Sequence, residues 1–430
     1  MRVVVVGAGV GGLACAVRLA ATGHEVCVLE QGEEPGGKAG RVELVEGART
    51  WRFDSGPSLL TMPWVVEELF SDTGTTLPEL VPVEPVTRYR FADGSAVELS
   101  ADLEASCVAL EGWSPGAGAD WRAFMLTCEA MWNASQPFLT GPPPWPPRRP
   151  APGDPTPDPR DLLRIKPWHT LRTLARAHTA DARLRMLIER FGTYAGVDPR
   201  RGPAALAVAG YVEHAFGAWH VRGGIHTIVR ALTDRLLALG GELRTGTTVR
   251  GIVRGRHRHA AGVRTEAGVV EGDHVIWNGD ALALARQLDG GRHEEERTLS
   301  GLALMLAVDG RTPGQVHHEI RFPTDYDREL DDLFRTRRPV RDPTLYVSTS
   351  SVSDPGEAPE DGENWFVLAN APSGVPADWE AEADRVIARL GVGDRVRARH
   401  VRSPADLERE TGAVGGAIYG AAAHGRLGTL

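Results

Sequence analysis

The chain has 430 residues, a net charge of −9 and a sequence pI near 5.9, so it lacks the general excess of positive charge that nucleic-acid binding requires. Hydrophobic residues make up 42% of the chain, which suits ordinary globular cores, and the length predicts two or three domains. The four cysteines show no C-x-x-C spacing and indicate neither a zinc site nor a disulfide framework, so we expect no metal.

The N-terminus does not look like a signal peptide, because glycines interrupt its apolar run and no cleavage pattern follows. No uninterrupted apolar run reaches transmembrane length. The sequence therefore predicts a cytoplasmic protein.

A glycine-rich turn follows the first predicted strand of the chain. The β-branched run at 3–6 predicts a buried parallel strand, and a helix begins directly after the turn. Gly7 permits the turn, Gly9 lets the backbone approach a pyrophosphate, and Gly12 lets the helix pack close to the strand. The glycines of this turn are Gly7, Gly9, Gly11 and Gly12. The pattern predicts a βαβ dinucleotide-binding unit.

A second strand at 25–29 ends in Glu30. A carboxylate at this place can accept hydrogen bonds from ribose hydroxyls and disfavours a ribose 2′-phosphate. The pattern contains every expected element in the expected order: strand, turn, helix, second strand and terminal acid. A glycine turn that binds no ligand is therefore the weaker alternative.

Two further segments, GGKAGR at 36–41 and FDSGPS at 53–58, extend the pattern beyond what an NAD-binding domain needs. They resemble the FAD signature of the amine oxidase and phytoene desaturase group of flavoproteins. The resemblance implies that the glycine pair runs under FAD, that a basic side chain meets its phosphates, and that the second segment contacts the flavin. The residues to which these roles carry over are Gly36, Gly37, Lys38, Arg41, Gly56, Pro57 and Ser58.

Beyond residue 57, a loop and a helix lead out of the first unit, and strand and turn signals between 81 and 99 begin another. The proline-rich segment 137–159 predicts a surface loop, either a lid or a tolerated insertion. The next segment, 160–190, carries eight basic and three acidic residues interleaved with Trp168 and several leucines. Such a segment suits an anionic membrane surface, but an amphipathic core helix with a solvated arginine face fits it equally well.

A series of motifs between 191 and 224 makes the resemblance specific. The motifs are F-x-x-Y-x-G from Phe191, Pro203-Ala204, Tyr211-x-Glu213, Gly217-x-Trp219 and Gly223-Gly224. They resemble the bacterial phytoene desaturase (carotenoid desaturase) family of FAD-dependent oxidoreductases. The segments at 61–70, 317–330 and 343–351 look most like the desaturases of hydroxylated or methoxylated carotenoids. In that family, the backbone near Val249 contacts the adenine.

The resemblance implies an α/β fold, with a Rossmann-like FAD-binding domain of the GR2 or amine oxidase type and an inserted α+β substrate domain. We expect the FAD-binding domain to comprise 1–75 and 221–300. The substrate domain would comprise 76–220 and 301–405, and 406–430 would return to the FAD-binding domain. Within the second FAD-binding part, a helix at 225–239 and a strand at 249–253 would complete a second βαβ-like unit.

Two histidine-containing segments invite a metal interpretation. The GRHRH turn at 255–259 lies between two predicted strands, and a solvent-exposed hairpin explains it better than a metal site. We expect His317 and His318 to be solvated in the same way.

The reaction that the resemblance implies is removal of two hydrogens from adjacent carbons of a long apolar carotenoid, one as a hydride to flavin N5 and one as a proton. Oxygen or a quinone would reoxidise the flavin, and a membrane surface would be the expected partner, which makes the protein peripherally membrane-associated. The candidates for the base are Glu213, His214 and His220, because they lie in the segment that re-enters the FAD-binding domain. Each of the three could instead be a hydrogen-bonding group of the core.

Other functions stay open at this point. One alternative is a carotenoid oxidase or isomerase, or an amine oxidase, which would need an aromatic pair beside the flavin. Another is an inactive remnant with a binding role. Family members continue past the element at 415–420 with a further FAD-domain strand, a glycine-rich flavin turn and a closing helix, whereas this sequence ends at Leu430. We therefore expect a C-terminal FAD segment to be missing and flavin retention to be weak.

Overall fold

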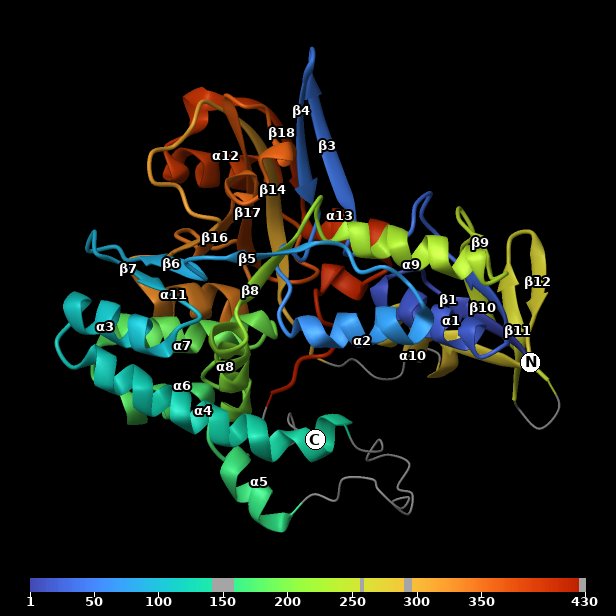
Figure 1. Ribbon diagram of the computed structural model, residues 1–430, viewed down its shortest axis with the longest axis horizontal. Helices are drawn as coiled ribbons and strands as arrows, with labels where there is room; N and C mark the ends of the chain where they lie inside the picture. Colours follow the sequence, from blue (N-terminus) through green and yellow to red (C-terminus); the bar gives the residue numbers. More distant parts are fainter. Residues whose placement is uncertain (141–157, 256–258, 290–295, 425–430) are drawn as a thin grey trace.

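Four parallel strands form a sheet in the order β13–β1–β2–β9, at the N-terminal end of the molecule in Figure 1. The computed structural model describes residues 1–140, 158–255, 259–289 and 296–424. The strands of this sheet are β1 (Arg2–Val6), β2 (Glu25–Leu29), β9 (Glu242–Arg244) and β13 (His274–Trp277). Because β1 is buried on both faces, its side chains form a continuous valine run.

Helices cover one face of this sheet and a small second sheet covers the other. Helices α1 (Val10–Ala21) and α9 (His226–Ala238) pack together with Val3 and Val5 in one core. On the other face, Val4 and Val6 pack against Val263 of an antiparallel three-stranded sheet. Its strands are β10 (Val249–Arg254), β11 (Ala260–Thr265) and β12 (Gly268–Glu271), and α10 (Ala281–Asp289) follows β13.

A seven-stranded sheet forms the second part of the molecule, in the order β18–β14–β17–β16–β15–β6–β7. Its strands are β6 (Thr87–Arg90), β7 (Ala96–Leu99), β14 (Ser300–Asp309), β15 (His318–Arg321), β16 (Leu345–Ser348), β17 (Gly362–Ala371) and β18 (Val396–Arg402). Strands from before residue 221 and from after residue 299 therefore pair within one sheet. One face packs against α12 (Trp379–Leu390), and α11 (Tyr326–Leu330) also belongs to this part. Helix α13 (Pro404–Thr411) leads from the last strand, β18, back to the first part.

Helices form a layer next to this sheet (Figure 1). They are α3 (Leu103–Trp113), α4 (Ala117–Thr140), α5 (Pro159–Ile165), α6 (Leu171–His178), α7 (Ala182–Tyr194) and α8 (Val208–Ala215). Trp121, Phe124 and Phe191 from this layer share a core with Tyr89 and Ile320 of the sheet. No described helix combines the length and the apolar character needed to cross a membrane.

Two strand pairs and one helix connect the two parts. The pairs are β3 (Arg41–Glu46) with β4 (Arg49–Asp54) and β5 (Leu80–Val83) with β8 (Ala218–Val221), and the helix is α2 (Pro63–Thr73). Trp51 and Phe53 of β4 are buried against the seven-stranded sheet. The hairpin that joins the two predicted FAD segments is therefore supported by the other part of the molecule.

Two expectations about secondary structure differ from the structure, and three further segments cannot be compared with it. The strand that follows α9 in the parallel sheet is β9, whereas 249–254 belongs to the antiparallel sheet, because the short strand β9 carries no strong hydrophobic pattern. Helix α4 continues through Pro137 to Thr140. Most of the proline-rich segment (141–157), part of the GRHRH turn (256–258) and the last residues (425–430) lie outside the described residues.

Candidate functional site

The glycine turn between β1 and α1 has the geometry of a dinucleotide-binding turn. Gly7 has a φ of 98°, which a residue with a Cβ rarely adopts. A Cβ on Gly12 would lie 2.1 Å from the carbonyl oxygen of Gly7, so only glycine permits this contact between helix and turn. Gly9 is the N-cap of α1, and no side chain caps the helix. The first N–H groups of α1 are therefore available to an anion, at the positive end of the helix dipole.

The second glycine pair lies against the first turn. The N–H of Gly36 donates to the carbonyl oxygen of Ala8 at 2.9 Å, and Gly36 forms a bridge with Gly9. Both Gly36 and Gly37 have positive φ, of 128° and 57°. Segments almost thirty residues apart in the sequence thus form one glycine-lined surface.

Glu30 is fixed at the end of β2. Its Oε2 accepts the N–H of Ala8 at 2.7 Å, and its Oε1 accepts the N–H of Gly32 at 2.9 Å. The side chain is 7% exposed and lines the cavity described below. Because a carboxylate oxygen can accept more than one hydrogen bond, Glu30 retains capacity for ribose hydroxyls.

These elements surround a cavity of about 550 Å³, within the range of small-molecule sites. Val6, Leu29 and Trp277 are the last residues of three parallel strands and all line it, so the cavity lies at the carboxyl edge of the sheet, where such folds bind nucleotides. Predicted site residues in its lining are Gly7, Gly9, Glu30, Gly36, Gly37, Lys38, Pro57 and Val249. Further lining residues are Thr247, Asn278, Asp280, Glu410, Thr411, Gly412 and Ala413.

The two basic residues predicted to meet the phosphates have other partners in the structure. The ammonium group of Lys38 donates to the backbone carbonyl of Ile418, and burial lowers the pKa of Lys38. Arg41 does not line the cavity, and its guanidinium donates to the carbonyl oxygen of Gly223 at 3.3 Å and pairs with Glu43 at 3.2 Å.

The FDSGPS segment passes close to the second glycine turn. A Cβ on Gly56 would lie 2.1 Å from the carbonyl oxygen of Lys38, which explains the glycine there. Pro57 faces the cavity, whereas the hydroxyl group of Ser58 lies 2.6 Å from that of Tyr346, which belongs to the seven-stranded sheet. This segment therefore lies between the cavity and the other part of the molecule.

Glu213 and His214, two of the three candidate bases, lie in α8 and are buried. The hydroxyl group of Tyr194 donates to Glu213 Oε2 at 2.8 Å, and the guanidinium of Arg190 lies 3.8 Å from Glu213 Oε1. Burial lowers the pKa of His214. The described residues that line the glycine-turn cavity include neither of the two.

His220, the third candidate, belongs to a buried histidine cluster. Its Nε2 lies 3.4 Å from Asp354 Oδ2, and its ring lies 5.2 Å from that of His317. His317 and His318 are buried, contrary to the expectation of solvated side chains, because β15 lies inside the large sheet between β16 and β6. Burial lowers the pKa of His318 to about 4 and also lowers the pKa of His317, so the expectation of solvated side chains was wrong. No group of described residues has the composition of a metal site.

Sequence reasoning missed the contribution of Asn278, Asp280 and the segment 410–413 to the cavity. A signal existed for the first two, because they directly follow β13 and carboxyl ends of parallel strands meet at one edge. No local pattern marks 410–413, which reaches the cavity only through the tertiary fold.

A parallel sheet with a glycine-lined cavity at its carboxyl edge and an acid at the end of its second strand defines a dinucleotide-binding protein. The chain belongs to the flavin-containing amine oxidoreductase family, whose model matches residues 10–306. It is an FAD-dependent oxidoreductase, and the cavity, with its glycine cradle and Glu30, fits the ADP half of FAD.

Known relatives and structures agree with this assignment. The chain is 31% identical to a hydroxyneurosporene desaturase of Rubrivivax gelatinosus, over 100% of this chain and 85% of the relative. It is 35% identical to a zeta-carotene-forming phytoene desaturase of Myxococcus xanthus, over 90% and 76%. A redesigned putrescine oxidase has the same fold with a TM-score of 0.63 and 16% identity, covering 100% of this chain and 89% of that one. An oxidoreductase of Methanosarcina mazei gives 0.60 and 18%, covering 93% and 87%. The predicted amine oxidase-like fold is confirmed.

Proposed function

We propose that the protein is a carotenoid desaturase that uses FAD as its hydrogen acceptor. The observation that carries this proposal is similarity along the whole chain to several desaturases of carotenoids, including a 1-hydroxycarotenoid 3,4-desaturase that is 27% identical over 99% of this chain. The glycine-turn cavity supports it, because it provides a place for the nucleotide half of FAD.

The residues of this chain hold and orient the cofactor. Glu30 accepts hydrogen bonds from the ribose hydroxyls, while N–H groups of the glycine turn and of the N-terminus of α1 donate hydrogen bonds to the pyrophosphate. When bound, FAD supplies a two-electron acceptor for a hydride from the polyene. The chain itself needs to exclude water, align the polyene and accept one proton.

The identity of the proton acceptor stays a prediction. Glu213, His214 and His220 are buried polar groups of the part that would hold the substrate, and this location supports them as candidates. Their contacts with Arg190, Tyr194 and Asp354 fit a purely structural role equally well. The final electron acceptor, oxygen or a quinone, also stays a proposal.

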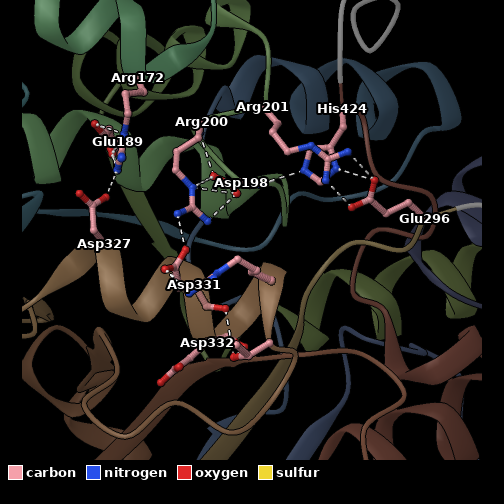
Figure 2. Close-up of polar contacts among 12 residues, drawn as sticks. Arg172, Glu189, Asp198, Arg200, Arg201, Glu296, Asp327, Asp331, Asp332 and His424 are labelled. Carbon is pink, nitrogen blue, oxygen red and sulfur yellow. Dashed lines mark hydrogen bonds and ion pairs between the residues drawn. The ribbon is translucent and has the colours of Figure 1, made fainter.

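We further propose that the protein collects its apolar substrate at an anionic membrane surface, through α5 and the turn that follows it. The leucine, isoleucine and phenylalanine side chains of α6 and α7 are buried. Leu163 and Trp168, at 61% and 53% exposed, remain for lipid contact. Part of the positive charge of this segment is neutralised within the protein, since Arg172 pairs with Glu189 and Asp327 (Figure 2). The lipid-contacting surface is therefore smaller than the whole segment 160–190.

Desaturation is tested by expressing the chain in cells that accumulate a defined carotenoid, with hydroxylated and unhydroxylated polyenes compared. We expect products with additional conjugated double bonds, which absorb at longer wavelength and weigh two mass units less for each bond formed. Glu30→Ala is the matched variant, and it should reduce both bound flavin and product. Unchanged pigments in every strain, with the chain soluble and flavin-loaded, would refute desaturation.

A carotenoid oxygenase is the second candidate. The chain is 29% identical over 98% of its length to a 4,4′-diapolycopene oxygenase of a Methylomonas species. The same pigment analysis separates the two functions, because an oxygenase adds the mass of oxygen whereas a desaturase removes hydrogen.

A further inference from the structure

Asn278 lines the cofactor cavity, although it was not among the predicted site residues. It directly follows β13, and its N–H donates to the carbonyl oxygen of Val6 at 2.8 Å, which extends the pairing of β13 with β1 by one residue. Its backbone packs against Gly7, because a Cβ on Gly7 would meet the carbonyl oxygen of Asn278 at 3.3 Å. The position of Asn278 is thus fixed by the sheet and by the glycine turn.

The carboxamide of Asn278 extends across the N-terminal end of α1. Its Nδ2 donates a long hydrogen bond of 3.4 Å to the carbonyl oxygen of Gly7. The Cβ positions that side chains at Gly11 and Gly12 would take lie 2.9 Å from Oδ1 and 2.8 Å from Nδ2 of Asn278. Side chains at Gly11 and Gly12 would therefore collide with the carboxamide of Asn278. The two glycines thus make room for this side chain, in addition to the close packing of the helix that Gly12 permits. The side chain lies where a pyrophosphate approaches a dinucleotide-binding turn.

The charge of the cavity makes a neutral donor valuable at this point. Glu30, Asp280 and Glu410 line the cavity, and the ammonium group of Lys38 is directed at a backbone carbonyl. Because carboxylates line this cavity, the oxygens of a bound pyrophosphate depend on neutral hydrogen-bond donors. These donors are the open N–H groups at the start of α1 and the carboxamide beside them.

We propose that Asn278 positions the pyrophosphate of FAD at the glycine turn, by holding Gly7 and by presenting a neutral carboxamide to the phosphate oxygens. The proposal rests on the placement of the ADP half of FAD in this cavity. It assigns to Asn278 a role in cofactor binding and none in hydrogen transfer.

The test compares Asn278→Asp and Asn278→Ala with the unchanged protein, using FAD, ADP and adenosine as separate probes in calorimetric titrations. We expect Asn278→Asp to weaken FAD and ADP at least about 30-fold, because it places a carboxylate beside the phosphates, and Asn278→Ala to weaken them about 10-fold. Adenosine, which has no phosphate, should bind all three proteins within about twofold. Asn133→Asp, an exposed substitution on α4, is the charge-matched control and should change nothing.

Thermal unfolding of the cofactor-free proteins separates this effect from loss of the fold. If Asn278→Asp does not fold, the comparison of ADP with adenosine is made on Asn278→Ala alone. ADP binding by Asn278→Ala at unchanged affinity, or an equal loss for adenosine and ADP, overturns the role of Asn278. Failure of the unchanged protein to bind either FAD or ADP overturns the placement of the cofactor instead.

Discussion

Glu329 has its carboxyl group buried in the interior beside the large sheet, with neutral partners. The N–H and the hydroxyl group of Thr344 donate to its two oxygens at 2.9 and 2.6 Å. Burial raises the pKa of Glu329 to about 7, and the hydrogen bonds from Thr344 only partly oppose this effect. The folded protein therefore binds a proton here that the unfolded chain releases near pH 4 to 5.

The sign of this shift predicts how stability depends on pH. Because the pKa of Glu329 is higher in the folded protein than in the unfolded chain, its contribution to the free energy of unfolding is complete below pH 4. This contribution, about 3 kcal/mol, is lost as the pH rises through 7. In Glu329→Gln, the loss of stability between pH 5 and pH 8 should be smaller than in the unchanged protein. Urea unfolding at both pH values measures the difference, with the exposed Glu67→Gln as a control that should leave the pH dependence unchanged.

At the scale of elements, the contact of α1 with β1 depends on the absence of a side chain at Gly12. Gly12→Ala would place a Cβ 2.1 Å from the carbonyl oxygen of Gly7, and neither backbone can move without disturbing the sheet. We expect a destabilisation of at least about 2 kcal/mol and the loss of flavin binding. Gly112→Ala in α3 is the matched control, because a Cβ there meets nothing within 4 Å, and it should stabilise the protein by about 0.5–1 kcal/mol. Melting temperatures of the two variants, with and without FAD, test both expectations.

The surface formed by α5 and the turn after it leads to a second prediction at this scale. Leu163→Ser combined with Trp168→Ser should reduce co-sedimentation with anionic vesicles about tenfold or more, because each side chain contributes over 1 kcal/mol when buried in lipid. Val108→Ser on α3 removes an apolar residue that is 73% exposed and should leave binding unchanged. Equal binding of the double variant and the unchanged protein would contradict the role of this surface.

For the molecule as a whole, the sequence predicted the parts whose signals are local. The first βαβ unit follows from a valine run, a glycine turn and the acid at Glu30, and the fold around it is confirmed by proteins of known structure. The strand β9 was missed because three residues carry no periodicity. The burial of α6 and α7 could not be decided from a pattern that a core helix and a membrane-surface helix share.

The cofactor cavity shows the same division between local and tertiary information. Gly36 and Gly37 were found through their motif, and Asn278 could have been found from its place directly after β13. The segment 410–413 enters the cavity only because the chain returns to the first turn at the end of α13. Lys38 lines the cavity as its motif implies, yet the direction of its ammonium group depends on Ile418, which is 380 residues away. Directions of side chains that depend on such distant contacts have no signature in the local sequence.

The pairing of β1 with β13 has a consequence for how the chain acquires its cofactor in the cell. The N–H of Arg2 donates to Asp273, a residue 271 positions later, and the parallel sheet remains open until that part has left the ribosome. At a synthesis rate of about 5–20 residues per second, the delay is roughly 15–55 seconds. During this time the edge of a valine-rich strand is unpaired, which makes it a target for chaperones and for aggregation. Because the cavity lining also includes 410–413, the complete cofactor cavity forms only after those residues have been synthesised.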